Sequence, residues 1–126
     1  MVLWALQNAL GGELFVPKIP SYRITDVAEA IGPSCEKPIT GIRPGEKIHE
    51  EMITTSDSFT TIDLSAYYAI LPSDGRVQKL YRETSVGSTA VPPGFAYNSG
   101  SNPDFLSVEQ LRTLIREHVD PAFEPA

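Results

Sequence analysis

Cysteine and histidine are scarce in this sequence, and their scarcity excludes whole classes of protein. Cys35 is the single cysteine, so no disulfide can form within the chain, which suits a reducing compartment. The histidines, His49 and His118, lie far apart and have no neighbour at the spacing of a metal site. We therefore expect neither a disulfide scaffold nor a bound metal ion, and we expect the protein to be cytoplasmic.

Clustered positive charge and long hydrophobic runs are also missing. The formal net charge is −6, and no run of Lys and Arg is present to bind nucleic acid or an acidic membrane surface. Residues 1–10 are apolar but too few to span a bilayer, and the first basic residue is Lys18, so the charged start of a signal peptide is lacking. We expect no nucleic-acid partner and no membrane partner.

Motifs for nucleotide-dependent catalysis are missing as well. A dinucleotide site needs a glycine-rich turn between a strand and a helix, whereas Gly11-Gly12 follows a predicted helix. Proton chemistry on a sugar alcohol often uses a Tyr with a Lys four positions later, because the Lys lowers the phenol's pKa. The residues four positions after the tyrosines are Asp26, Leu71, Pro72, Ser85 and Ser101. We therefore assign no catalytic and no cofactor-binding residue to this chain.

What is present is the patterning of a small mixed α/β domain. In the first part of the chain, apolar spacing and turn residues predict a helix over 2–10, a strand over 14–16, and a helix capped by Thr25 and ending near residue 31. A strand over 39–43 and a helical turn over 46–52 follow. This alternation is typical of a piece that packs against a larger sheet.

The second part of the chain is predicted to hold a hairpin and a helix. Residues 60–71 are apolar and aromatic, and a Pro-Ser-Asp-Gly turn separates them from residues 77–81, which we expect to return as the second arm. Residues 84–94 are rich in Ser, Gly and Pro and predict a loop. Ser107 and Gln110 form a capping box at the start of an amphipathic helix.

Arg43 and Glu46 are the candidate binding residues, within the segment Gly-Ile-Arg-Pro-Gly-Glu-Lys at residues 41–47. Arg43 ends a predicted strand, where α/β proteins often bind ligands. Its planar guanidinium suits two phosphate oxygens, and a carboxylate such as Glu46 suits the hydroxyls of a ribose. Together they match a nucleoside diphosphate. A surface ion pair worth at most about 1 kcal/mol is the simpler explanation of the spacing, so both interpretations stay open.

Longer segments of the chain resemble one family. Residues 12–21 (GELFVPKIPS), 41–53 (GIRPGEKIHEEMI), 67–72 (YYAILP) and 95–100 (FAYNSG), together with the final helix, are similar to the C-terminal part of the inverting UDP-N-acetylglucosamine 4,6-dehydratases. Those enzymes open the pseudaminic acid pathway, which supplies a sugar for flagellin glycosylation and surface polysaccharide. They belong to the extended short-chain dehydrogenases/reductases.

The resemblance implies a fold and a division of labour. Residues 1–126 would be the small α/β substrate-binding domain, with a core binding segment at 1–58 and a hairpin-and-helix extension at 59–126. The Rossmann domain, which holds NADP and the catalytic Tyr and Lys in the family, is absent from this sequence. By the same resemblance, Arg43 contacts the diphosphate of a UDP-sugar, Glu46 contacts the ribose or uridine side, and Lys18 lies in a matching loop.

The resemblance also implies what this chain does not do alone. In the family, NADP takes a hydride from C4 of the sugar, water leaves across C5–C6, and the hydride returns to C6 with inversion at C5. Because the cofactor site and the Tyr/Lys pair are not in these residues, we expect binding and orientation of the UDP-sugar but no dehydratase activity. NADP would be bound only by the full-length enzyme.

Other interpretations stay open. Related capsule-type dehydratases and epimerases resemble the 41–47 segment, but they usually have Tyr in place of His49 or His in place of Pro44. A stand-alone, non-catalytic protein that associates with itself is the alternative from another class. Apolar residues of the first helix (Val2, Leu3, Trp4 and Leu6) would lack the cover of a Rossmann domain, so we expect a homo-oligomer.

Overall fold

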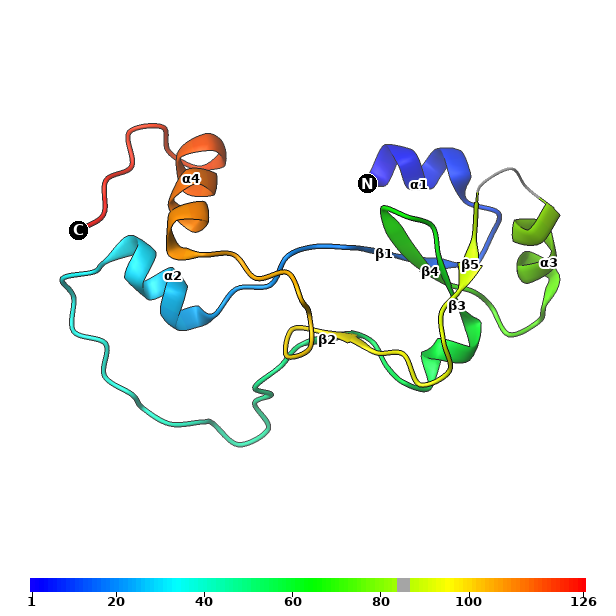
Figure 1. Ribbon diagram of the computed structural model, residues 1–126, viewed down its shortest axis with the longest axis horizontal. Helices are drawn as coiled ribbons and strands as arrows, with labels where there is room; N and C mark the ends of the chain where they lie inside the picture. Colours follow the sequence, from blue (N-terminus) through cyan, green and yellow to red (C-terminus); the bar gives the residue numbers. More distant parts are fainter. Residues whose placement is uncertain (84–86) are drawn as a thin grey trace. The chain divides into compact units, whose positions relative to one another are not determined.

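The computed structural model describes residues 1–83 and 87–126, which divide into two packed units. The first unit comprises Met1–Ile19 and Glu50–Asn98, and the second comprises Pro20–His49 and Ser99–Ala126. Each unit is therefore built from segments far apart in sequence, as the colours of Figure 1 show. The prediction of a mixed α/β fold is confirmed. The division at residue 58 concerned ligand binding and stays a prediction.

The first unit is organised around an antiparallel sheet with the strand order β1-β4-β3-β5 (Figure 1). Its strands are β1 (Leu14–Pro17), β3 (Thr61–Asp63), β4 (Tyr67–Ile70) and β5 (Thr89–Ala90). β3 and β4 form a tight hairpin, in which Thr61 pairs with Ile70 and Asp63 with Tyr68. A smaller antiparallel pair joins β2 (Glu51–Ile53) to β6 (Tyr97–Asn98), and the 3₁₀ helix η1 (Asp57–Thr60) leads into β3.

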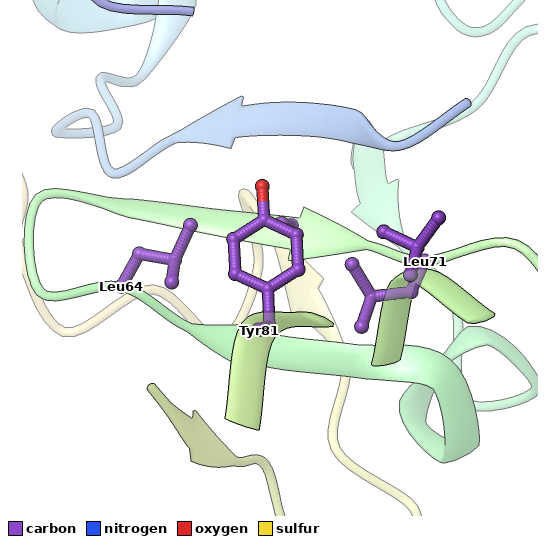
Figure 2. Close-up of a cluster of buried hydrophobic side chains, with 5 residues drawn as sticks. Leu64, Leu71 and Tyr81 are labelled. Carbon is purple, nitrogen blue, oxygen red and sulfur yellow. The ribbon is translucent and has the colours of Figure 1, made fainter. Parts of the chain in front are cut away.

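Helix α3 (Arg76–Glu83) supplies part of the core of this unit. Its Val77 and Tyr81 are buried together with Leu64, Ala69 and Leu71 of the hairpin region, and Figure 2 shows Tyr81 lying between Leu64 and Leu71. Each fully buried side chain of this kind contributes about 1.5–3 kcal/mol to folding. This cluster therefore fixes the hairpin that carries Asp63, at the end of β3, and Ser65, in its loop.

Helix α1 (Val2–Asn8) and β1 confirm the helix and strand predicted at the start of the chain. Gly12, between them, has φ +81°, and a Cβ there would lie 3.1 Å from the Pro72 ring, so both the backbone and the packing favour glycine. The expectation that Trp4 lacks cover is wrong. Its ring stacks on Tyr67 and meets Phe15 edge-on, with centroids 4.5 and 5.2 Å away.

The second unit packs helix α2 (Ile24–Ile31) against helix α4 (Val108–His118). The predicted capping box is confirmed, because the Ser107 hydroxyl accepts from the Gln110 N–H and the Gln110 side chain accepts from the Ser107 N–H. Arg112 of α4 donates to the carbonyls of Glu29 and Ala30 at the end of α2. A cation at this end of a helix satisfies carbonyls that have no partner within the helix.

Several predicted elements of the second unit are wrong. Residues 39–43 form no strand, and Ile39 is 99% exposed, because no neighbouring strand pairs with this segment. Residues 46–52 form no helical turn; they are irregular up to the start of β2. Thr25 does not cap α2, since Arg23 occupies the N-cap position and no side chain caps it.

The predicted hairpin of the first unit is also misplaced. Its two arms are β3 and β4, which lie within the 60–71 stretch, and residues 77–81 belong to helix α3. Asp74 of the Pro-Ser-Asp-Gly segment accepts a hydrogen bond from the Arg76 N–H, which favours a helix start. The predicted loop at 84–94 includes residues 84–86, which lie outside the described residues, and its remainder contains β5. No described helix is long and apolar enough to cross a membrane.

Candidate functional site

Residues Arg43, Pro44, Gly45 and Glu46 form a closed β-turn in the second unit. The Glu46 N–H donates to the Arg43 carbonyl over 3.0 Å, and Gly45 has φ +81°. Proline at the second position and a glycine with positive φ at the third are the signature of a type II turn. A Cβ at Gly45 would meet nothing within 4 Å, so the backbone conformation alone requires glycine here.

The Glu46 carboxylate closes the same turn from the other side. Its Oε2 accepts a hydrogen bond from the Arg43 N–H over 2.9 Å, so the side chain folds back over the turn. The turn thus brings together the two candidate binding residues of the sequence analysis. The structure does not place Arg43 at the end of a strand, however, because the segment before it is irregular.

The turn lies within a long exposed segment, since every residue from 33 to 51 is exposed. Ile42 and Ile48, on either side of it, are 60% and 77% exposed. The turn thus presents a guanidinium, a carboxylate and two aliphatic side chains to solvent. Chemically, it offers a fork for phosphate oxygens and an acceptor for hydroxyls.

Lys18 lies in the first unit, at the end of β1, and is engaged by neighbours of its own. Its Nζ donates to both carboxylate oxygens of Asp63, over 2.7 and 2.8 Å, and lies 4.5 Å from the centre of the Tyr68 ring. The pair is about one-third exposed, so it contributes little to stability. Lys18 and Asp63 therefore form a cluster within the first unit, whereas the turn that holds Arg43 and Glu46 belongs to the second.

Sequence reasoning missed this second cluster. Tyr68 is surrounded by Phe95 and Tyr97, with ring centroids 5.1 and 5.4 Å from its own. Burial raises the pKa of Tyr68, Lys18 opposes that rise, and Asp63 and Tyr97 add to it. The phenol is therefore a neutral hydrogen-bonding group at ordinary pH. Asp63 and Tyr68 are paired across the short β3–β4 hairpin, and this is what brings the cluster together. The sequence indicates the pair only once the register of β3 and β4 is known.

The described part of the chain contains no recognisable binding site for a cofactor or a metal ion. No three side chains of His, Cys, Asp or Glu gather there in the manner of a metal site. The strand-to-helix connections from β1 to α2 and from β4 to α3 lack the G-x-G-x-x-G pattern that cradles a dinucleotide. The residues present therefore do not fit NADP.

Comparison with known proteins identifies the class to which this fold and this turn belong. The model of a family described as polysaccharide biosynthesis protein matches residues 1–72, which is more than half of the chain. The chain therefore belongs to this family of polysaccharide biosynthesis proteins.

Within that class, the chain is homologous to part of an inverting nucleotide-sugar dehydratase. It is 42% identical over 118 residues to the UDP-N-acetylglucosamine 4,6-dehydratase (inverting) of Campylobacter jejuni, a match that covers 90% of this chain and 35% of that protein. The match corresponds to the C-terminal region of the dehydratase. The chain thus spans about a third of the length of the curated relatives it matches.

More distant relatives match this chain over a similar length. The UDP-glucose 4-epimerase of Rickettsia felis is 31% identical over 119 residues, covering 91% of this chain and 34% of the epimerase. Among solved structures, Pen from Bacillus thuringiensis superimposes with a TM-score of 0.72 at 26% identity, over 91% of this chain and 34% of that one. The fold described above is therefore a recurring portion of larger proteins.

Proposed function

We propose that this chain forms the nucleotide-sugar-binding portion of an inverting UDP-N-acetylglucosamine 4,6-dehydratase. The main support for this proposal is the sequence identity of 42% to such an enzyme over 90% of this chain, a region that includes the turn at residues 43–46. In this proposal, Arg43 contacts the diphosphate and Glu46 the ribose or uridine side of a UDP-sugar. The pathway leads to pseudaminic acid, and the reaction takes place in the cytoplasm.

The closed turn favours these roles on physical grounds. Because the Glu46 carboxylate binds the Arg43 N–H, the two residues are held in one closed turn, and less conformational entropy is lost there when a ligand binds. The Arg43 guanidinium lies on an exposed segment, where a diphosphate reaches it without first displacing a buried partner. A charge-assisted, two-pronged contact of this kind is among the stronger hydrogen-bonded interactions in proteins.

A Rossmann domain, as the partner of this region, would hold NADP and carry the hydride chemistry. The described residues do not fit that cofactor, so this region contributes affinity and orientation of the sugar rather than bond-making steps. Correct orientation of the reacting centre lowers a barrier by up to about 7–11 kcal/mol in favourable systems, so such a contribution is substantial. For the isolated chain, which lacks that domain, we propose a homo-oligomer built through the exposed face of α1.

Substitution of Arg43 tests the assignment in the complete enzyme that contains this region. Arg43→Ala is expected to weaken UDP-N-acetylglucosamine binding by about 2–3 kcal/mol, which is the cost of a charge-assisted hydrogen bond plus an unpaired partner. NADP affinity is expected to stay unchanged. Isothermal titration of both ligands measures the two effects separately.

A matched control for this experiment is Arg82→Ala, which removes the same charge from an exposed position on α3. It is expected to leave both affinities at the wild-type level. An equal loss of affinity for both ligands in Arg43→Ala would show that Arg43 is structural. An unchanged UDP-sugar affinity would refute its assignment to the diphosphate.

A further inference from the structure

A cleft of about 470 Å³ opens in the first unit beside the β3–β4 hairpin, and the proposed function does not use it. Its size falls within the range of roughly 300–1,000 Å³ that is typical of small-molecule sites. The polar lining comes from Asp63, Ser65 and Thr89, and the apolar lining from the rings of Tyr68 and Phe95 and from Val91 and Pro92. The cleft therefore combines hydrogen-bonding oxygens with aromatic surface.

Charge at this cleft is balanced, which argues against an ionic ligand. The Lys18 ammonium donates to both oxygens of the Asp63 carboxylate, over 2.7 and 2.8 Å, so the two charges neutralise each other locally. A phosphate would have to compete with Asp63 for Lys18, and a cation would have to compete with Lys18 for Asp63. A neutral ligand rich in hydroxyls meets neither competitor.

Hydrogen-bonding capacity remains at Asp63 despite this pair. Its Oδ1 accepts from Lys18 and from the Ser65 N–H over 2.8 Å, while its Oδ2 accepts from Lys18. Since each carboxylate oxygen accepts about two hydrogen bonds, Oδ2 retains capacity for a ligand hydroxyl. A hydroxyl bound there would be oriented by a carboxylate that is itself fixed by two neighbours.

The aromatic rings of the cleft offer an apolar surface. The rings of Tyr68 and Phe95 are inclined by 50° at a centroid distance of 5.1 Å, so they pack against each other and a ligand meets only their outer surfaces. The C–H face of a pyranose ring is itself apolar and can pack against such a surface.

Ser65, in the loop of the β3–β4 hairpin, lies at the rim of the same cleft. It has φ +71° and is the one non-glycine residue with positive φ in the described part of the chain. A left-handed conformation is unfavourable for a residue with a Cβ, and glycine would adopt it without strain. A residue with positive φ is usual in the short loop of a hairpin, and here it carries a hydroxyl at the rim of the cleft.

We propose that this cleft binds the pyranose ring of a saccharide, with Asp63 and Ser65 contacting ring hydroxyls and Tyr68 and Phe95 contacting the apolar ring face. Its lining residues all belong to the first unit, whereas the turn at residues 43–46 belongs to the second. Its ligand is a neutral sugar rather than a nucleotide.

Titration of the ¹⁵N-labelled chain with N-acetyl-D-glucosamine, followed by amide chemical shifts, tests this proposal. We expect saturable shifts at Ser65, Tyr68 and Phe95 with a dissociation constant on the order of millimolar. Asp63→Asn is expected to weaken binding at least about tenfold, the factor that corresponds to one lost charge-assisted hydrogen bond. Asp74→Asn is the matched control, because it removes a carboxylate from an exposed pair with Arg76 instead.

Ser65→Gly separates a binding role from a structural one. It relieves the positive φ, so its unfolding midpoint is expected to rise while its affinity for the sugar falls by about threefold or more. The proposal is overturned if no saturable shift appears, if Asp63→Asn and Ser65→Gly both bind like the wild type, or if UDP produces equal shifts at the same amides. If Asp63→Asn fails to fold, the Ser65→Gly result decides. Arg43→Ala is expected to leave this titration unchanged.

Discussion

Glu13 links the end of α1 to the core of the first unit. Its carboxylate accepts hydrogen bonds from the Leu10 N–H, from the Gly11 N–H over 2.7 Å and from the Tyr81 hydroxyl over 3.2 Å. Burial alone works to raise the pKa of Glu13, but the hydrogen bonds from Leu10, Gly11 and Tyr81 outweigh it, and the net pKa is lowered. Burial, reinforced by Glu13, raises the pKa of Tyr81.

Acid stability is expected to depend on Glu13. Because the pKa of its carboxyl is lower in the folded state, its stabilising effect is full above the unfolded pKa, near pH 4–5, and is lost as pH falls through the folded pKa. Glu13→Gln is therefore expected to be less stable than the wild type at pH 7 and to lose less stability between about pH 5 and pH 3. Urea unfolding at a series of pH values measures this.

The control for acid stability is Glu117→Gln, an exposed carboxylate near the end of α4. It is expected to follow the wild-type pH profile. Parallel pH profiles for the wild type and Glu13→Gln would contradict the role given to the Glu13 carboxylate.

The capping box of α4 gives the sharpest stability prediction for a secondary-structure element. Ser107→Ala removes the side-chain acceptor for the Gln110 N–H and is expected to lower the free energy of unfolding by about 1 kcal/mol, whereas Ser107→Asp retains an acceptor and most of the stability. Thermal unfolding monitored by circular dichroism measures both. Thr113→Ala, whose hydroxyl bonds only to the Glu109 carbonyl within the helix, is the control and should change stability by less than about 0.5 kcal/mol. A loss as small for Ser107→Ala would contradict the capping role.

Elements with a local signal at their ends could be predicted, and those that depend on a distant partner could not. The glycines after α1 and the capping box of α4 act through their own neighbours, and both helices are confirmed. The strand predicted over 39–43 needed a pairing partner that the fold does not supply. Helix α3 was not predicted, because the Pro-Ser-Asp-Gly segment before it indicates a hairpin turn. The four-residue spacing of Val77 and Tyr81, which is typical of one helix face, was the correct indication.

Site residues follow the same distinction. The turn that joins Arg43 to Glu46 was foreseeable, because Pro44-Gly45 specifies its conformation within four residues. The Lys18–Asp63 pair spans 45 positions, and its formation depends on the pairing of β1 with β4 and of β4 with β3. No spacing rule in a single sequence indicates such a contact.

Self-association is expected of the isolated chain because α1 carries uncovered apolar side chains. Val2, Leu3 and Leu6 are 72%, 77% and 75% exposed, and burial of each would contribute about 1.5–3 kcal/mol. Sedimentation over a concentration series should show a dimer, with α1 as the simplest symmetric contact.

The variant Leu3→Asp tests that contact, since it places a charge on the exposed side of α1 and is expected to give a monomer. Gln7→Asp is the control: it introduces the same charge on the same helix at a residue that is already polar. A wild-type chain that stays monomeric at high micromolar concentration would contradict the prediction. So would a Leu3→Asp variant that dimerises like the wild type.

The central claim, that this region binds a UDP-sugar through the turn at residues 43–46, is tested most directly by an NMR titration. UDP-N-acetylglucosamine is added to the ¹⁵N-labelled chain, and the amide resonances of Arg43 and Glu46 are followed, because each N–H takes part in closing the turn. The account predicts saturable shifts at both amides that disappear in Arg43→Ala. Saturable shifts confined to other residues, or no shift at either amide at millimolar ligand, would contradict it.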